Sequence, residues 1–126
     1  MDVFQPGQHG STYGGNPIAC AVAEAALDVL EEEGLYDRSI ELGGWFLGEL
    51  RNLSSPHVKE VRGAGLWIGV ELNDDAGGAR KFCEALMHRG ILCKETHTHI
   101  IRFAPPLVIG RADLEWALGG IAAVLA

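Results

Sequence analysis

The chain has 126 residues, of which 48% are hydrophobic, and its 17 acidic and 10 basic side chains give a formal net charge of -7 at pH 7. This length and composition predict a globular domain with a buried core rather than a disordered segment. An acidic chain without a Lys/Arg cluster argues against nucleic acid and anionic membranes as partners. No apolar run approaches the roughly 18 residues that a membrane span needs.

The cysteines and the first residues concern the cellular compartment. Cys20, Cys83 and Cys93 are an odd number at wide spacing, and residues 1–6 have neither a basic region nor an apolar stretch. Such cysteines favour free thiols over a disulfide framework, and such a start is not a targeting signal. We therefore expect a cytoplasmic protein whose chain is entered midway.

The first predicted elements are a loop and a helix. Residues 5–16 are rich in glycine and in small polar side chains, which favours a loop. Asn16 followed by Pro17 supplies an N-cap and a residue suited to the first helical position. The Ala-rich segment up to Gly34 then predicts a helix over 17–33. This helix is apolar nearly all round, so it must be covered on several sides.

The rest of the chain alternates helices with short strands. Hydrophobic periodicity, glycines and prolines place the boundaries. The predicted helices cover 35–53, 76–89 and 111–125, and the predicted strands cover 58–63, 66–72, 91–94 and 100–103. Helices that flank a small sheet indicate an α+β fold.

The loop from His9 to Pro17 is the first candidate site. Its glycines let backbone N–H groups converge, and the hydroxyls of Ser11 and Thr12 can donate to an anion such as phosphate. The spacing matches no phosphate-binding fingerprint, so on spacing alone a capped, flexible helix entry is the favoured interpretation.

Arg102 is the second candidate. It stands alone among apolar neighbours in Ile100-Ile101-Arg102-Phe103, where a charge needs a partner or exposure. A guanidinium forms two parallel hydrogen bonds to a carboxylate, so an amino-acid substrate would suit it. An internal Asp or Glu would serve equally, and without further information that salt bridge is the commoner case.

The segment from Cys93 to His99 is the third candidate, for a metal ion. It holds a thiol and a His-x-His, but it lacks the paired spacing of structural zinc sites. A polar turn between strands is the better interpretation, and we predict no metal site.

Three stretches of the chain resemble class III aminotransferases, which are fold type I pyridoxal-phosphate enzymes. They are His9-Gly10-Ser11-Thr12-Tyr13-Gly14-Gly15-Asn16-Pro17, Val61-Arg62-Gly63-Ala64-Gly65-Leu66 and Ile100-Ile101-Arg102-Phe103-Ala104-Pro105-Pro106-Leu107-Val108-Ile109. The first two are typical of the class at large. The Pro-Pro form of the third, together with Lys94-Glu95-Thr96-His97, makes the chain most similar to the ornithine-specific branch.

The resemblance implies a place for each part of the chain. Residues 1–16 would be a loop of the large cofactor domain, residues 17–34 an interdomain helix, and residues 35–126 the C-terminal small domain with a small, mostly antiparallel sheet. Ser11 and Thr12 would reach across a dimer to the cofactor phosphate of the neighbouring subunit. Arg102 would bind the α-carboxylate of glutamate or 2-oxoglutarate, which outweighs the salt-bridge interpretation.

The resemblance also implies an activity and a partner. The enzyme would transfer the δ-amino group of ornithine to 2-oxoglutarate through pyridoxal 5'-phosphate, giving glutamate semialdehyde and glutamate. The family's Schiff-base lysine lies upstream of the matching region, and Lys59, Lys81 and Lys94 do not match its motif. We therefore expect the chain alone to be inactive and to need a large-domain polypeptide, in a homo- or hetero-oligomer.

Two alternatives remain open at this point. The substrate of the same chemistry could be acetylornithine or another ω-amino acid. A protein of another class, a non-catalytic small-ligand-binding or interaction domain, could also have helices and strands of this size. Such a self-sufficient module has little reason to keep a helix that is apolar on all sides.

Overall fold

The computed structural model describes residues 5, 7 and 9–126. The chain divides into two compact units, Met1–Gly34 and Leu35–Ala126. Residues 6 and 8 of the predicted loop lie outside the described residues. Residues 1–4, which entered the expectation about a targeting signal, lie outside them as well. The two units are described separately below.

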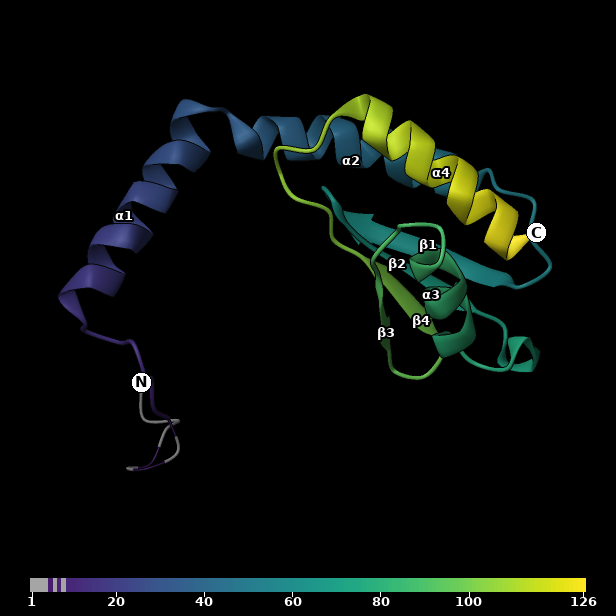
Figure 1. Ribbon diagram of the computed structural model, residues 1–126, viewed down its shortest axis with the longest axis horizontal. Coiled ribbons are helices and arrows are strands. Elements are labelled where there is room, and N and C mark those ends of the chain that lie inside the picture. Colours follow the sequence, from purple (N-terminus) through teal and green to yellow (C-terminus); the bar gives the residue numbers. More distant parts are fainter. Residues whose placement is uncertain (1–4, 6, 8) are drawn as a thin grey trace. The chain divides into compact units, whose positions relative to one another are not determined.

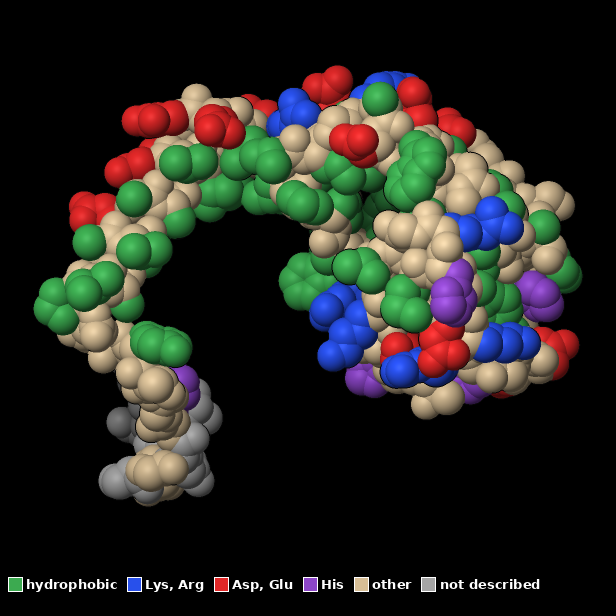
Figure 2. Space-filling model, viewed as in Figure 1, with side chains coloured by type: hydrophobic (Ala, Val, Ile, Leu, Met, Phe, Trp, Pro, Cys, Tyr) green, Lys and Arg blue, Asp and Glu red, His purple; other side chains and the backbone are tan. Residues whose placement is uncertain are grey.

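The first unit consists of a loop and one helix, α1 (Pro17–Glu32). Asn16 caps the helix, because its side-chain oxygen accepts hydrogen bonds from the backbone N–H groups of Ile18 at 3.0 Å and Ala19 at 3.2 Å. None of the residues of α1 is buried. Figure 2 shows hydrophobic side chains along one side of this helix and acidic side chains along another. The helix predicted over 17–33 is thus present, and its apolar side chains are open to contact.

The second unit is a sheet with helices packed on it (Figure 1). Its elements are α2 (Leu35–Arg51), β1 (Val58–Ala64), β2 (Trp67–Leu72), the 3-10 turn η1 (Asp74–Ala76), α3 (Arg80–Met87), β3 (Lys94–Thr96), β4 (Ile100–Phe103) and α4 (Arg111–Leu125). The sheet has the strand order β1-β2-β4-β3, and each neighbouring pair is antiparallel. The predicted α+β fold with a small antiparallel sheet flanked by helices is confirmed.

The two faces of the sheet differ in burial. Alternate residues of β2 and β4 are buried in one core with residues of α2, α3 and α4, which are therefore the helices that cover this face. The buried strand residues are Ile68, Val70, Leu72, Ile101 and Phe103, and the buried helix residues include Phe46, Leu50, Phe82, Leu86, Leu114 and Ile121. The intervening strand positions, including Trp67, Gly69 and Arg102, lie on the opposite, open face.

Two predicted boundaries were wrong. The helix predicted from residue 76 begins at Arg80, because Gly77 and Gly78 have φ values of 76° and 89°, in the left-handed region that a helix cannot contain. The strand predicted over 91–94 begins only at Lys94. Ile91 still belongs to the exit of α3, since its N–H donates to the carbonyl of Leu86 at 3.0 Å and its side chain is buried in the core.

Candidate functional site

The loop before α1 presents hydroxyl groups at the surface. The Oγ atom of Ser11 accepts a hydrogen bond from the N–H of Gly14 at 2.8 Å, and the N–H of Asn16 donates to the carbonyl of Tyr13 at 3.1 Å. These bonds fold the loop into a turn, and Ser11 and Thr12 are both exposed. Among the described residues, Ser11 uses only its acceptor, so its O–H remains available to donate to an anion.

Arg102 lies in the middle of the sheet, on its open face. It is directly opposite Gly69 on β2 and directly opposite Lys94 on β3. Gly69 has no side chain, so it leaves a recess beside Arg102, and a Cβ atom added there would meet Ile100 Cγ2 at 3.4 Å. A guest molecule can therefore lie against the backbone of β2 beside the guanidinium.

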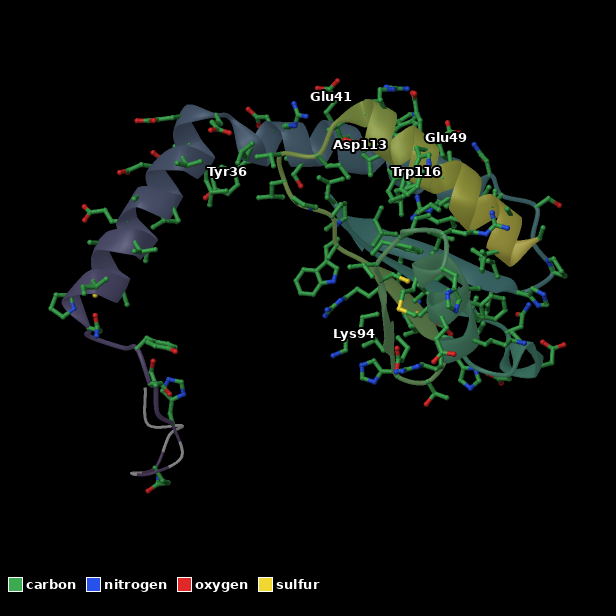
Figure 3. All side chains as sticks on the ribbon, viewed as in Figure 1. Tyr36, Glu41, Glu49, Lys94, Asp113 and Trp116 are labelled. Carbon is green, nitrogen blue, oxygen red and sulfur yellow. The ribbon has the colours of Figure 1, made fainter. Side chains whose placement is uncertain are left out.

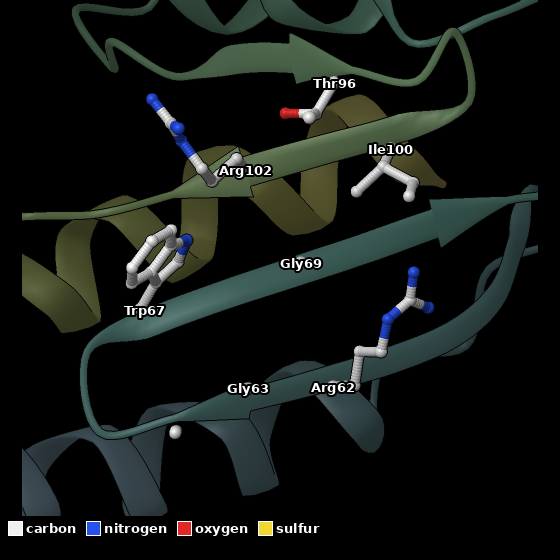
Figure 4. Close-up of a pocket in the computed structure, with 8 residues that line it drawn as sticks. Arg62, Gly63, Trp67, Gly69, Thr96, Ile100 and Arg102 are labelled. Atoms are coloured by element: carbon white, nitrogen blue, oxygen red, sulfur yellow. The ribbon is translucent and has the colours of Figure 1, made fainter. Parts of the chain in front are cut away.

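A pocket of about 380 Å³ occupies this part of the open face. All four strands contribute to its lining, with Trp67 and Gly69 from β2, Thr96 from β3, and Ile100 and Arg102 from β4. Figure 4 shows these side chains on the side of the sheet turned away from the helices. The indole of Trp67 is 67% exposed and forms an apolar wall next to the charged group.

The two arginines of the pocket differ in their partners. Arg62 donates to Glu60 Oε2 at 2.9 Å and to Glu71 Oε2 at 2.6 Å. Its hydrogen bond to Glu71 raises the pKa of Arg62, and hydrogen bonds from Lys59 and Arg62 lower the pKa of Glu71. Arg102 has no hydrogen bond or ion pair with any residue that the structure describes. Its charge is therefore available to a carboxylate from outside.

Thr96, Trp67 and Gly69 were missed by the sequence reasoning. Trp67 and Gly69 occupy alternate positions of β2, so they share a face, and Gly69 pairs with Arg102. The alternation was visible in the sequence, but the pairing of β2 with β4 was not, because α3 and β3 intervene in the chain. Only that pairing indicates which residues surround Arg102.

The segment between Cys93 and His99 contains the β3–β4 turn. His97 and Thr98 have φ values of 49° and 63° there. Burial and the neighbouring Cys83 raise the pKa of the Cys93 thiol to about 12. Across residues 5, 7 and 9–126, no group of three or more His, Cys, Asp or Glu side chains could hold a metal ion.

Across the same residues, the structure contains no helix with the length and apolarity needed to cross a membrane.

Comparison with known proteins shows the family of this chain. The family described as Aminotransferase class-III matches residues 1–125. The chain therefore belongs to the class III aminotransferases, and the resemblance inferred from its motifs is confirmed.

Individual relatives show which class III aminotransferases this chain is similar to. The chain is 58% identical to the ornithine aminotransferase of Bacillus subtilis over 125 residues, which are 99% of this chain and 30% of that protein. It matches a crystal structure of acetylornithine aminotransferase from Elizabethkingia anophelis with a TM-score of 0.85 and 46% identity, over 99% of this chain and 32% of that one. It matches ornithine aminotransferase from Toxoplasma gondii with a TM-score of 0.84 and 44% identity, over 99% and 30%. The chain thus spans about 30% of the length of the curated relatives it matches.

Proposed function

We propose that this chain forms the carboxylate-binding part of a pyridoxal-phosphate-dependent ornithine aminotransferase. The observation that carries the proposal is the Arg102 guanidinium, which lies in an open pocket without a partner among the described residues. The assembled enzyme transfers the δ-amino group of ornithine to 2-oxoglutarate, giving glutamate semialdehyde and glutamate. The identity of 58% to an ornithine aminotransferase supports this substrate. Membership of an aminotransferase family favours it over a non-catalytic interaction domain.

Arg102 binds the α-carboxylate of 2-oxoglutarate or glutamate in this proposal. Its planar guanidinium can give two parallel hydrogen bonds to one carboxylate, which fixes both the position and the orientation of the substrate. The recess at Gly69 and the exposed indole of Trp67 leave room for the apolar part of the same molecule. An internal salt bridge, the alternative role for Arg102, has no acidic partner in the described part of the chain.

Ser11 and Thr12 hold the phosphate of the cofactor in a neighbouring subunit of a dimer. The turn fits this role, since the Ser11 O–H is left to donate and Thr12 is exposed beside it. Pyridoxal phosphate, when bound, supplies the electron sink that amino-group transfer requires. The residues of this chain contribute anchoring and orientation to that chemistry.

The remaining groups come from a large-domain polypeptide that carries the Schiff-base lysine. We assign residues 1–16 to a loop of the large cofactor domain, residues 17–34 to an interdomain helix, and residues 35–126 to the C-terminal small domain. The share of about 30% of the relatives' length and the unburied apolar side chains of α1 support such a partner. We place the assembly in the cytoplasm, where the thiols of Cys83 and Cys93 stay reduced.

Acetylornithine is the second candidate substrate. It is favoured by the match at 46% identity to the acetylornithine aminotransferase of Elizabethkingia anophelis. Both candidates require a carboxylate site for the keto acid, so Arg102 has the same role in each. A comparison of kcat/KM for ornithine and acetylornithine in the assembled enzyme decides between them.

Arg102→Lys in the assembled enzyme tests the role of the guanidinium. Loss of the two-pronged contact should weaken 2-oxoglutarate and glutamate by about 2 to 5 kcal/mol and leave cofactor binding intact. The matched control is Arg111→Lys, because Arg111 lies on α4, where it pairs with Glu115. Steady-state kinetics with varied keto acid measure the effect. Equal KM values for wild type and Arg102→Lys would show that the guanidinium does not bind the keto acid and that Arg102 has a structural role.

A further inference from the structure

The hairpin of β3 and β4 brings a second polar group to the pocket of Arg102. Thr96 pairs with Ile100, and Lys94 pairs with Arg102, so Thr96 is the diagonal neighbour of Arg102 on the adjacent strand. Both Thr96 and Arg102 line the pocket on the open face. Figure 4 shows the Thr96 hydroxyl on the side of its strand that faces Arg102.

The hydroxyl of Thr96 has no hydrogen-bond partner among the residues that the structure describes. Its Oγ1 atom is buried and, within the part of the chain that the structure describes, nothing donates to it or accepts from it. A buried hydroxyl without a partner is destabilising, because it has lost its hydrogen bonds to water and gained none in return. Polar atoms of this kind are rare in folded proteins and call for a physical explanation.

The turn that holds Thr96 is strained. His97 and Thr98 both have a positive φ, although neither is glycine and Thr98 is β-branched. The turn is held in place by hydrogen bonds from the N–H of Ala79 to the Thr98 carbonyl at 2.7 Å and from the N–H of Leu72 to the His99 carbonyl at 2.8 Å. Strained backbone of this type persists where the surrounding structure fixes it, often beside a functional site. Here these two hydrogen bonds fix the turn that follows β3, and with it the position of Thr96.

We propose that Thr96 Oγ1 donates a hydrogen bond to the same carboxylate that Arg102 binds. This inference rests on the proposed function. A carboxylate has about four lone-pair positions, of which the guanidinium fork occupies two, so an oxygen can also accept from a hydroxyl. The Cα atoms of diagonal neighbours on adjacent strands lie about 7–8 Å apart. This spacing accommodates one carboxylate between the hydroxyl and the long arginine side chain. Because Oγ1 is closed to solvent in the substrate-free structure, this bond requires the Thr96 side chain to rotate about its Cα–Cβ bond toward the pocket. Thr96 is thus a substrate-binding residue that satisfies its hydroxyl only when the keto acid is bound.

Thr96→Val in the assembled enzyme tests this inference, because valine keeps the shape and removes the hydroxyl. The dissociation constant of 2-oxoglutarate, measured by calorimetry, and its KM should rise roughly 10- to 100-fold. Thr96→Ser keeps a hydroxyl and should stay close to the wild type. The melting temperature of the substrate-free protein should not fall in Thr96→Val, since the substitution removes a polar group that had no partner.

The outcomes separate this inference from the proposed function. If Thr96→Val leaves the dissociation constant unchanged while Arg102→Lys raises it, the role of Thr96 is refuted and that of Arg102 stands. If neither substitution changes it, both fail. If Thr96→Val and Thr96→Ser weaken 2-oxoglutarate equally, the hydroxyl is not the cause, and the inference is again refuted.

Discussion

Lys94 and Arg102 are directly opposite each other on neighbouring strands, although both are cations. Like charges in this position repel each other, and neither side chain has an ion-pair partner among the described residues. Figure 3 shows Lys94 extending from β3 away from the helices. An anion bound at Arg102 would relieve the repulsion, which agrees with a carboxylate site there.

Lys94→Glu tests this arrangement by giving Arg102 an internal carboxylate. The new pair should compete with the substrate, so the KM for 2-oxoglutarate in the assembled enzyme should rise roughly 1.5- to 5-fold. Lys94→Gln removes the like charge without supplying a competitor. An equal rise in both variants would show that the loss of the lysine, and not competition by the glutamate, weakens the substrate.

The three thiols should differ in their rate of alkylation at pH 8. Burial raises the pKa of Cys83, and burial together with the neighbouring Cys83 raises the pKa of Cys93 to about 12. A raised pKa keeps a thiol in its unreactive protonated form, so at pH 8 Cys83 and Cys93 should be alkylated slowly and the exposed Cys20 first. Mass spectrometry of the chain after brief treatment with iodoacetamide measures the order. Rapid labelling of Cys93 at pH 8 would contradict the raised pKa.

At the scale of elements, α2 approaches the β1–β2 turn closely at two glycines. A Cβ atom at Gly43 would collide with the backbone of Gly65, which has a φ of 54°. The Ser39 hydroxyl accepts a hydrogen bond from the N–H of Leu66 at 3.2 Å and ties the same turn to the helix. The stretch that includes Gly63 and Gly65 is typical of the class. The close packing of α2 against this turn explains why glycine is needed at position 65.

Gly43→Ala should accordingly destabilise the second unit. The added methyl group has no space, so the free energy of unfolding should fall by about 1 to 3 kcal/mol or more. Gly44→Ala is the matched control, because nothing lies within 4 Å of a Cβ atom there. In a helix this change should stabilise by about 0.5 to 1 kcal/mol. Urea denaturation of both variants gives the comparison, and similar losses in the two would refute the close approach.

Most elements could be predicted because their signals are local. Asn16 and Pro17 start α1, and alternation of buried side chains defines β2. The start of α3 could not be predicted, since the left-handed glycines Gly77 and Gly78 end a 3-10 turn that no periodicity shows. For the candidate site, the sequence predicted Arg102 from its lone charge among apolar residues and from the family resemblance. Its neighbours depend on strand pairing across a long sequence separation, which a single sequence does not contain.

At the scale of the whole molecule, α1 shows apolar surface that no described residue of its own unit covers. Ile18 and Val22 are 77% and 64% exposed, and α1 has no buried residue. Exposed apolar patches of a few hundred Å² mark interaction surfaces. This agrees with the proposed large-domain partner.

The chain alone should form no stoichiometric, borohydride-stable adduct with pyridoxal phosphate at any one lysine. The hydrogen bond between Lys59 and Glu71, at 2.8 Å, raises the pKa of Lys59 and keeps its amine protonated, and Lys81 lies over the ring of Phe82. Mixing with a lysine-bearing large-domain polypeptide should yield a single adduct on that polypeptide and ornithine transamination. Peptide mapping after reduction locates the adduct.

Ser11→Ala combined with Thr12→Ala in that mixture should weaken pyridoxal phosphate and leave the KM for ornithine unchanged. A monomeric chain that ignores such a partner would contradict the proposed assembly.

The one-sided covering of the sheet bears on how such an assembly forms. The strand that holds Arg102 shares a core with α2, α3 and α4, and the strand that holds Thr96 pairs with it, all within Leu35–Ala126. The proposed carboxylate pocket is therefore built from residues of this unit alone, and we expect it to acquire its shape when this unit folds. Association with a partner then needs no further ordering of these strands. The conformational entropy that these strands lose on binding is therefore small. Docking onto this preformed surface, and not folding of these strands upon contact, should set the rate at which the proposed assembly forms.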